Sequence, residues 1–367
     1  MKKQPKLLYY AYPLALLLLL SCQRETLENG DLRLLELEAI ELNPTAYAIE
    51  KVIPLETTSA NLLGDYLTVK FSEKACFVFD ESARDAIHRY DLNGKYLGRF
   101  IEIGDGPNRI ESVNDFIPTP EGLEILSVKG DRSTIIQLDR NGEMTGQLTL
   151  DYYGTSFAKL PGGYYAASGS YNLPFVENRL AIIDEQGKTV KTFLPNTHAL
   201  LPMQEKNFYA ANGSVFFHEI YNNRTYQILE DSLAPSYQFD FGTYRIPERF
   251  FEMDWMAGFE MLSQQGFAVI SQHWESEKKA FFGVDVQADG ERKNHQIILD
   301  KRDLQAKKRI ASTRDLAAFY HPVGVFDEFL VFIAQAPDYL KLEADQLPDD
   351  SPMVQEGDNP VLLFVDF

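Results

Sequence analysis

The stretch Ile87-His88-Arg89-Tyr90-Asp91-Leu92-Asn93-Gly94 is a mainly apolar run that ends in an aspartate and a turn glycine. The same unit returns as Ile135-Ile136-Gln137-Leu138-Asp139-Arg140-Asn141-Gly142 and as Leu180-Ala181-Ile182-Ile183-Asp184-Glu185-Gln186-Gly187. Asparagine and glycine accept positive φ at little steric cost, so each unit predicts a strand that closes in a tight hairpin. The three turn glycines are 48 and 45 residues apart.

The repeat continues beyond these three units. A degenerate version spans Tyr226 to Leu233, and a fifth spans Phe282 to Gly290. A hairpin every 40–50 residues or so leaves room for four short strands per repeat, which is the period of a propeller blade. Solenoid repeats are typically shorter or helical. The sequence therefore predicts an all-β fold, a β-propeller.

Two segments interrupt the strand pattern. Pro247 to Gln265 carries apolar residues at spacings of three and four, which predicts a small helical insert. Asp303 to Phe319 is a second helical candidate with a basic start. Leu342 to Asp358 is acidic, contains two prolines and predicts a long surface loop.

The N-terminus predicts export. Three lysines precede an apolar stretch that peaks at Leu14 to Leu20 and is too short to span a membrane, a layout typical of a signal peptide over residues 1–21. Leu18-Leu19-Leu20-Ser21-Cys22 resembles the lipobox of bacterial lipoproteins, which implies that Cys22 carries acyl chains and anchors the chain to a membrane. The alternative is an ordinary signal peptide in which Cys22 is incidental.

Residues 22–46 are predicted to form an acidic tether between the lipid and the globular part, with a short helix over Leu32 to Leu37. Gln23 follows the lipidation cysteine where an aspartate would direct retention. By resemblance to lipoprotein sorting rules, this favours the outer membrane within the cell envelope.

Charge and cysteine content restrict the partners. The net charge is −19, and removal of residues 1–21 with their three lysines makes it −22. Nucleic acid and an anionic bilayer surface would repel such a chain, so we exclude nucleic acid as a partner. If Cys22 is lipidated, Cys76 has no disulfide partner, and its apolar surroundings predict a core position.

Three stretches carry a resemblance to a known family. The first stretch, near the start of the predicted propeller, is Ile53-Pro54-Leu55-Glu56-Thr57-Thr58. The second is Gly104-Asp105-Gly106-Pro107, which follows the first unit of the repeat. The third, near the C-terminus, is Asp358-Asn359-Pro360-Val361-Leu362-Leu363-Phe364. These stretches resemble the six-bladed β-propeller lipoproteins of Bacteroidetes. The resemblance implies a six-bladed β-propeller over residues 47–367 in which a strand near Ile53 pairs with one near Leu362. The family's Gly-Pro-Gly-Glu is Gly106-Pro107-Asn108-Arg109 here, so a role of that acidic position is not carried over.

No catalytic motif is present in the sequence. The six histidines lack zinc-site spacing, and there is neither a phosphate-binding glycine loop nor a Gly-x-Ser-x-Gly elbow. The Asp-x-Asn-Gly turns lack the distal acidic residue of a calcium loop. We therefore assign no catalytic residue, no metal ligand and no cofactor.

The candidate ligand contacts lie in loop-like stretches that are rich in tyrosine and amides, since ring faces and planar hydrogen-bonding groups suit carbohydrate or peptide. His218-Glu219 follows the strand-like Val215 to Phe217. The alternative is that the tyrosines pack between blades and that His218-Glu219 is a satisfied strand-end pair. The candidate ligand-binding residues are Tyr171, Asn172, His218, Glu219, Tyr221, Arg224 and His273.

These observations favour a membrane-anchored exported lipoprotein whose propeller binds a ligand or partner, a glycan, a peptide or an envelope protein. By resemblance, the setting is nutrient capture at the outer membrane. The alternative is a lyase or hydrolase that acts on glycans or lactones and combines His218, Glu219, His273 and Arg245 across blades. A third interpretation is a structural partner with an exposed apolar patch over Phe250 to Phe259.

Overall fold

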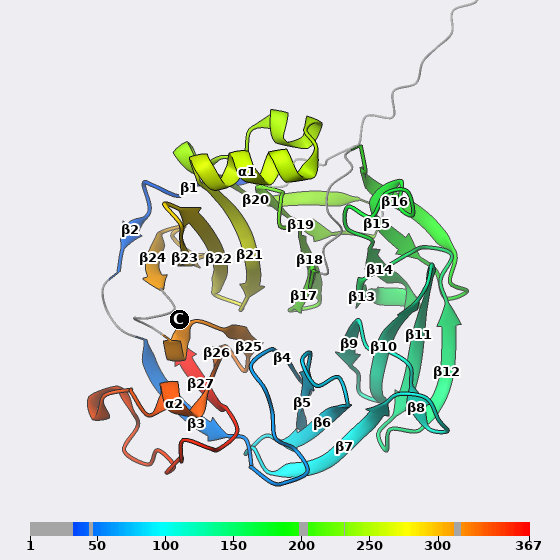
Figure 1. Cartoon of the computed structure of the whole chain (residues 1–367), viewed down its shortest axis with the longest axis vertical. Helices are drawn as coiled ribbons and strands as arrows, with labels where there is room; N and C mark the ends of the chain where they lie inside the picture. Colours follow the sequence, from blue (N-terminus) through cyan, green and yellow to red (C-terminus); the bar gives the residue numbers. More distant parts are fainter. Residues whose placement is uncertain (1–31, 44–46, 198–204, 231, 312–316) are drawn as a thin grey trace, which may run out of the picture.

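The computed structural model describes residues 32–43, 47–197, 205–230, 232–311 and 317–367. Their strands form six sheets arranged around a central axis (Figure 1). The fold is therefore a six-bladed β-propeller, as the sequence and the family resemblance predicted. The predicted signal peptide and Cys22 lie outside the described residues.

The first three blades follow one another along the chain. Blade I holds β4 (Leu67–Phe71), β5 (Ala75–Asp80), β6 (Ala86–Asp91), β7 (Tyr96–Ile103) and a short parallel β8 (Arg109–Ile110). Blade II holds β9 (Asp115–Pro118), β10 (Gly122–Lys129), β11 (Arg132–Asp139) and β12 (Met144–Thr149). Blade III holds β13 (Ser156–Lys159), β14 (Tyr165–Ser168), β15 (Asn178–Ile183) and β16 (Thr189–Pro195).

The other three blades recruit strands from the N-terminal part of the chain. Blade IV holds β17 (Phe208–Ala211), β18 (Ser214–His218), β19 (Arg224–Ile228), β20 (Leu233–Asp240) and β1 (Arg33–Glu36). Blade V holds β21 (Phe267–Glu275), β22 (Lys279–Ala288), β23 (Glu291–Asp300), β24 (Ala306–Ala311) and β2 (Glu41–Leu42). Blade VI holds β25 (Pro322–Phe326), β26 (Phe329–Ala334), β27 (Val361–Asp366) and β3 (Ala48–Pro54).

The ring closes in blade VI. The first strands of neighbouring blades contact one another all the way round, from β4 through β9, β13, β17 and β21 to β25 and back. The outermost strand β3 comes from the N-terminal side and pairs antiparallel with the C-terminal β27, with Ile53 opposite Leu362. This confirms the predicted closure, which removes the free sheet edge that an open ring would leave.

The predicted aspartate–glycine units form the hairpins between the third and fourth strands of blades I to III. In blade I, the Asp91 carboxylate accepts hydrogen bonds from the backbone N–H groups of Asn93 and Lys95, both at 2.9 Å. Gly94 has φ +82°. A Cβ atom on Gly94 would lie 2.1 Å from the carbonyl oxygen of Pro54 in blade VI. The glycine is thus required both by the turn and by the approach of the neighbouring blade.

The same contact recurs at the next two junctions. A Cβ on Gly142 would lie 2.1 Å from the Phe100 oxygen of blade I, and one on Gly187 would lie 2.1 Å from the Thr149 oxygen of blade II. We call this contact the glycine staple. It joins blade VI to I, I to II and II to III.

The fifth unit was assigned to the wrong hairpin. Phe282 to Gly290 lies on β22 and its turn to β23, which are the second and third strands of blade V. The equivalent of the glycine hairpin is instead the turn from Asp300 to Gln305, which contains no glycine and in which Leu304 takes φ +62°. The pattern matched because any β-hairpin favours Asp-Gly at its turn.

The helical inserts were predicted in part. Pro247 to Gln265 contains the 3₁₀ helix η3 (Glu248–Glu252) and the helix α1 (Trp255–Gln265), with Asp254 as N-cap. The helix predicted over Asp303 to Phe319 is wrong, because β24 occupies its first half and pairs with β23. Among the described residues of this stretch, the helical part is the short 3₁₀ helix η4 (Ala317–Phe319). Pairing with a neighbouring strand overrode a helix-like spacing of apolar residues.

The remaining short helices are η1 (Pro161–Gly163), η2 (Gly242–Tyr244), α2 (Ala336–Tyr339) and η5 (Ala344–Gln346). Outside η5, the Leu342 to Asp358 region is irregular, as expected. Cys76 is buried in β5, and burial raises the pKa of its thiol, in agreement with a core role.

The segment predicted as a tether lies on the propeller where it is described. The helix predicted over Leu32 to Leu37 is wrong, because β1 pairs in parallel with β20 and places Arg33 opposite Tyr237. β2 pairs in parallel with β24. The buried Leu35 and Leu37 join a core cluster between blades IV and V. The segment from β1 to β2 therefore straps these two blades together from outside.

Candidate functional site

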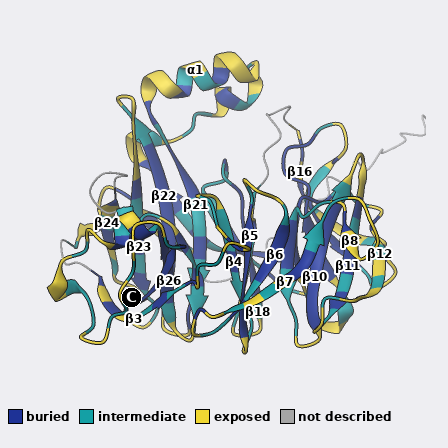
Figure 2. Cartoon of the chain, turned by 60° about the horizontal axis from the view of Figure 1, so that its bottom comes forward, coloured by how far each residue is buried: buried dark blue, intermediate teal, exposed yellow. Residues whose placement is uncertain are grey.

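The connections of blades III and IV converge at one end of the strands. They are the loop 169–177 between β14 and β15, the loop 219–223 between β18 and β19, and the insert 241–266 between β20 and β21. We call this region the III–IV loop cluster. Figure 2 shows α1 standing out from the strands at this end of the propeller.

Local hydrogen bonds shape the first of these loops. Ser170 takes φ +51°, and the side-chain amide of Asn172 donates to the Gly169 carbonyl. The Val176 N–H donates to the Asn172 carbonyl at 3.0 Å. Asn172 therefore closes the loop on itself, in the way asparagine favours turns.

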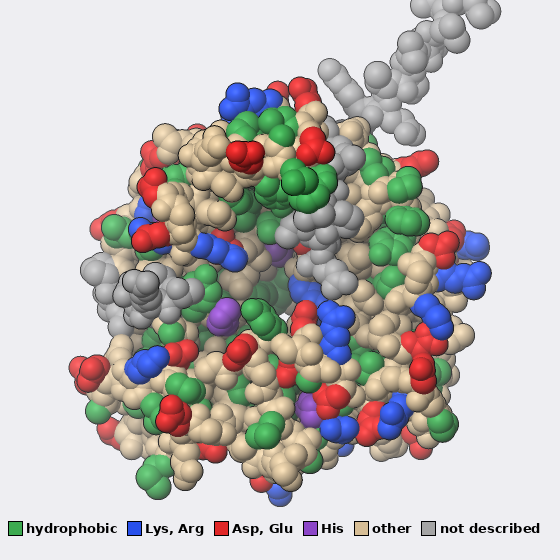
Figure 3. Space-filling view, viewed as in Figure 1, with side chains coloured by type: hydrophobic (Ala, Val, Ile, Leu, Met, Phe, Trp, Pro, Cys, Tyr) green, Lys and Arg blue, Asp and Glu red, His purple; other side chains and the backbone are tan. Residues whose placement is uncertain are grey.

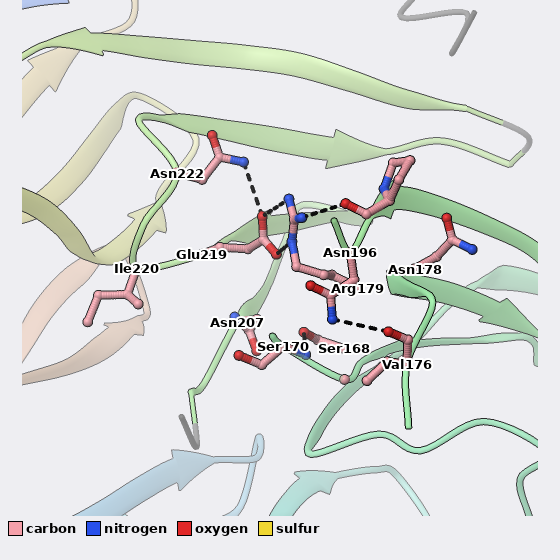
Figure 4. Close-up of polar contacts among 12 residues, drawn as sticks. Ser168, Ser170, Val176, Asn178, Arg179, Asn196, Asn207, Glu219, Ile220 and Asn222 are labelled. Carbon is pink, nitrogen blue, oxygen red and sulfur yellow. Dashed lines mark hydrogen bonds and ion pairs between the residues drawn. The ribbon is translucent and has the colours of Figure 1, made fainter. Parts of the chain in front are cut away.

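A buried ion pair joins the two blades. Arg179, at the start of β15, donates from Nε to Glu219 Oε1 at 2.6 Å and from Nη2 to Oε2 at 3.2 Å (Figure 4). Asn222 also donates to Glu219 Oε2, at 3.1 Å, while Arg179 Nη1 donates to the Pro195 carbonyl at 2.8 Å. The Glu219 side chain is only 1% exposed. This bidentate geometry matches the planar guanidinium of an arginine to the two oxygens of a carboxylate.

Electrostatics hold Arg179 charged. Burial alone would lower the pKa of Arg179, but the neighbouring Glu219 carboxylate outweighs it, so this pKa is raised. The guanidinium also lies 4.6 Å from the ring centre of Tyr171, a cation–π distance. Burial raises the pKa of Tyr171 well above its ordinary value, so its hydroxyl stays protonated.

Aromatic packing fixes the insert onto the two loops. Tyr171, Tyr221, Phe250, Leu262 and Val269 form one buried cluster. The Tyr221 ring centre lies 5.9 Å from that of Tyr171 and 5.6 Å from that of Phe250. Edge and tilted contacts of this kind stabilise by about 0.5–1.5 kcal/mol each beyond burial. The insert is therefore part of the packed fold.

A second carboxylate lies beside the ion pair. Glu205 accepts hydrogen bonds from Ser170 Oγ at 3.0 Å, from Asn207 Nδ2 at 2.9 Å and from the Ile220 N–H at 3.0 Å. Burial and the nearby Glu219 charge raise the pKa of Glu205 to about 7. A carboxyl group that titrates near neutral pH can take up or release a proton under physiological conditions.

The structure brings four predicted residues together. Tyr171, Asn172, Glu219 and Tyr221 all lie in this cluster, and all four are buried. They hold the loops from beneath, as the alternative of tyrosines packed between blades anticipated. Their direct contact with a ligand stays a prediction.

The other three predicted residues lie elsewhere. Arg224 is half-buried on β19 and donates from Nε to Gln238 at 2.9 Å. The buried His273 stacks on Phe282 and lies 3.1 Å from Glu275 Oε1. Burial first, then the proximity of His273, lowers the pKa of His218 to about 4, so His218 is neutral at neutral pH.

Arg179, Glu205 and Asn207 complete the network and were not predicted from the sequence. Their partners come from another blade or from the connection between blades, so no local spacing marks them. The only sequence signal was the position of Arg179 directly after the aromatic loop. Within the part of the chain that is described, no group of His, Cys, Asp or Glu side chains is arranged to hold a metal ion.

The chain belongs to a protein family. The model of a domain of unknown function, DUF4934, matches residues 47–366. This range covers the propeller from β3 to β27.

Two solved structures share the fold. A Bacteroides fragilis protein described as a "putative exported protein" is 14% identical, with a TM-score of 0.72 over 90% of this chain and 99% of its own. A member of the DUF4221 family from Bacteroides vulgatus is 12% identical, with a TM-score of 0.52 over 87% of this chain and 97% of its own. At these identities the similarity shows the fold alone. None of the curated proteins matches the sequence.

None of the described helices has the length and apolar character that crossing a bilayer requires.

Proposed function

We propose that this protein is an exported lipoprotein, anchored through Cys22 in the cell envelope, whose propeller binds a ligand or a partner protein at the III–IV loop cluster. The lipobox-like sequence and the signal peptide pattern support the anchor, and Gln23 favours the outer membrane. The geometry of the loop cluster supports the binding role.

The observation that carries the proposal is the exposure of large apolar side chains on structurally fixed loops. Phe175 in loop 169–177 is 64% exposed, and in α1 Trp255 and Met256 are 42% and 64% exposed. Phe251 and Phe259 pack half-buried at the edge of the aromatic cluster. Figure 3 shows hydrophobic side chains at the insert, at the top of the view. Exposed aromatic residues on a rigid base are typical of recognition surfaces.

The buried network beneath supplies the rigidity. Because the ion pair of Arg179 and Glu219 and the ring contacts of Tyr171 fix the loops in the free protein, binding would cost little ordering entropy. The strongly negative chain favours neutral or cationic partners, such as a neutral glycan or a basic peptide.

The test is a binding screen of the full-length protein, purified in detergent, against glycan and peptide panels. We expect a ligand whose affinity falls about tenfold or more in the double variant Trp255→Ala/Met256→Ala, since exposed anchors contribute about 1–2 kcal/mol each. Met144→Ala is the matched control, because Met144 on β12 of blade II is 53% exposed, a value between those of Trp255 and Met256. The absence of any ligand, or equal loss in both variants, would argue against the proposal.

The anchor has its own test. Growth with a labelled fatty acid should label the wild-type protein and leave Cys22→Ser unlabelled, and mass spectrometry should locate the acyl chains on residue 22. A labelled Cys22→Ser protein would overturn the assignment.

Glu205 favours a second function, a propeller enzyme that acts on glycans or lactones. A carboxyl group with a pKa of about 7, held by three hydrogen-bond donors, has the properties of a general acid or base. Turnover of such substrates that is lost in Glu205→Gln with unchanged folding would establish it. Binding that survives this substitution, without turnover, would favour the binding role.

A further inference from the structure

A cavity lined by both charged and apolar side chains lies between blades IV and V, at the opposite end of the strands from the III–IV loop cluster. Its volume is about 290 Å³. This is at the lower end of the range for ligand pockets, about 300–1,000 Å³. The lining residues are Arg33, Phe216, Gln227, Ala234, Pro235, Ser236, Tyr237, Glu275 and Lys301.

The cavity lies where the glycine staple is missing. Blade V turns from β23 to β24 through Asp300 to Gln305, and this turn contains no glycine that could form the staple. Instead the turn sends Lys301 inward, where Nζ donates to the Ser276 carbonyl at 2.8 Å and pairs with Glu275. The edge of blade IV on the other side is covered by β1, which contributes Arg33.

The charges inside the cavity do not cancel. Burial would raise the pKa of Glu275, but the hydrogen bond from His273 and the Lys301 charge outweigh it, so this carboxyl is ionised at neutral pH. Lys301 therefore balances Glu275. The guanidinium of Arg33 lies 5.8 Å from the ring centre of Tyr237, and no carboxylate among the described residues pairs with it.

We propose that this cavity binds a small organic acid through one carboxylate, which pairs with Arg33 and is supported by Lys301. Arg33 presents a planar fork that matches a carboxylate, and Ser236 and Gln227 offer hydrogen bonds to hydroxyl groups on the body of the ligand. The rings of Phe216 and Tyr237 form the apolar wall. The volume suits a molecule of about the size of one acidic sugar.

The charge count distinguishes a carboxylate from a phosphate. Arg33, Lys301 and Glu275 sum to one positive charge, which one carboxylate neutralises. A dianionic phosphate would leave an excess negative charge beside the buried Glu275 carboxylate, which is costly at low local dielectric. A carboxylate ligand should therefore bind more tightly than a phosphate ligand of the same size.

Titration calorimetry of the full-length protein in detergent tests this inference with four probes of related size: glucuronate, galacturonate, glucose 1-phosphate and glucose. We expect at least one uronate to bind. Glucose 1-phosphate should bind more weakly, and glucose should give no measurable heat. Binding should weaken about tenfold or more in Arg33→Gln, because a charge-assisted hydrogen bond contributes about 1.5–3 kcal/mol, and should recover in part in Arg33→Lys.

Arg302→Gln is the matched control. Arg302 follows Lys301, pairs with Asp300 and is exposed outside the cavity. Arg302→Gln therefore changes the net charge by the same amount as Arg33→Gln. We expect its affinity to equal that of the wild type, and both variants to keep the wild-type melting temperature, since Arg33 lies on an outer strand. The inference is overturned if no uronate binds, if glucose binds as tightly, or if Arg33→Gln and Arg302→Gln weaken binding alike.

Discussion

The six blade junctions divide into two kinds. From blade VI to I, I to II and II to III, a hairpin glycine lies against a backbone carbonyl of the preceding blade. The other three junctions lack this staple. The junction of blades III and IV contains the buried ion pair, and that of blades IV and V contains the cavity. At the junction of blades V and VI, the hairpin is replaced by the pairing of β27 with β3, two strands from opposite ends of the chain.

The difference separates scaffold from site. Where the repeat is kept, neighbouring blades meet backbone to backbone at the staple. The ion pairs Lys70–Asp115 and Lys159–Glu124 cross two of these junctions as well. Where it is lost, side chains of specific chemistry fill the junction instead, and the insert and the strap of β1 and β2 are added there. The departures from the repeat are therefore where we place both proposed binding regions.

The largest effect should come from the side-chain junction. Arg179→Met would leave the Glu219 carboxylate, 1% exposed, buried without its cation. We expect a loss of about 3–5 kcal/mol in the free energy of unfolding, measured by urea denaturation. Arg302→Met, which breaks an exposed pair with Asp300, should leave the denaturation midpoint almost unchanged. Equal losses would show that the buried pair does not hold blades III and IV together.

The staple should come next. Gly142→Ala adds a Cβ about 2.1 Å from the Phe100 carbonyl oxygen at φ +85°. Strain and displacement of the neighbouring blade together should cost about 2–4 kcal/mol. Gly290→Ala is the control, because Gly290 has φ +75° and no neighbouring atom within 4 Å. Its loss should be about 1 kcal/mol, from the backbone conformation alone. Similar losses at both sites would mean that the glycine serves the turn only.

The smallest effect is a pH dependence at the III–IV junction. The pKa of Glu205 is about 7 in the fold, above its unfolded value of 4.5. The folded state therefore binds the extra proton, and wild-type stability contains a contribution that is lost as the pH rises from about 4.5 through 7. The glutamine of Glu205→Gln stays neutral at every pH. The free energy of unfolding of this variant, relative to that of the wild type, should therefore increase by about 1–3 kcal/mol over that interval and stay constant above it. A difference that does not change with pH would contradict the assignment.

The repeat could be predicted because it rests on local chemistry, and the closure could be predicted because the family resemblance implied it. Asp91-x-x-Gly94 and its two copies encode a turn wherever they stand, and the apolar strands near Ile53 and Leu362 fit the ends of one blade. The insert was visible because its apolar residues follow a helical period. Each of these signals lies within a few consecutive residues.

The missed features depend on partners far along the chain. β1 has one buried side chain, Leu35, and its parallel addition to β20 leaves no alternation long enough to recognise. β24 follows a turn without glycine, and the spacing of Leu304, Ile310 and Leu316 suggested a helix. Arg179 and Glu219 are 40 residues apart and meet only because their blades are neighbours. The sequence therefore indicated the loops of the proposed site, but not the arginine that joins them.

Hydrogen exchange with and without a ligand from the glycan or peptide screen tests the central claim most directly. If the irregular junctions form the site, binding should slow amide exchange in loops 169–177 and 219–223 and in the insert 241–266, while the outer strands of blades I and II stay unchanged. Protection confined to blades I and II, with none in the III–IV loop cluster, would contradict this account.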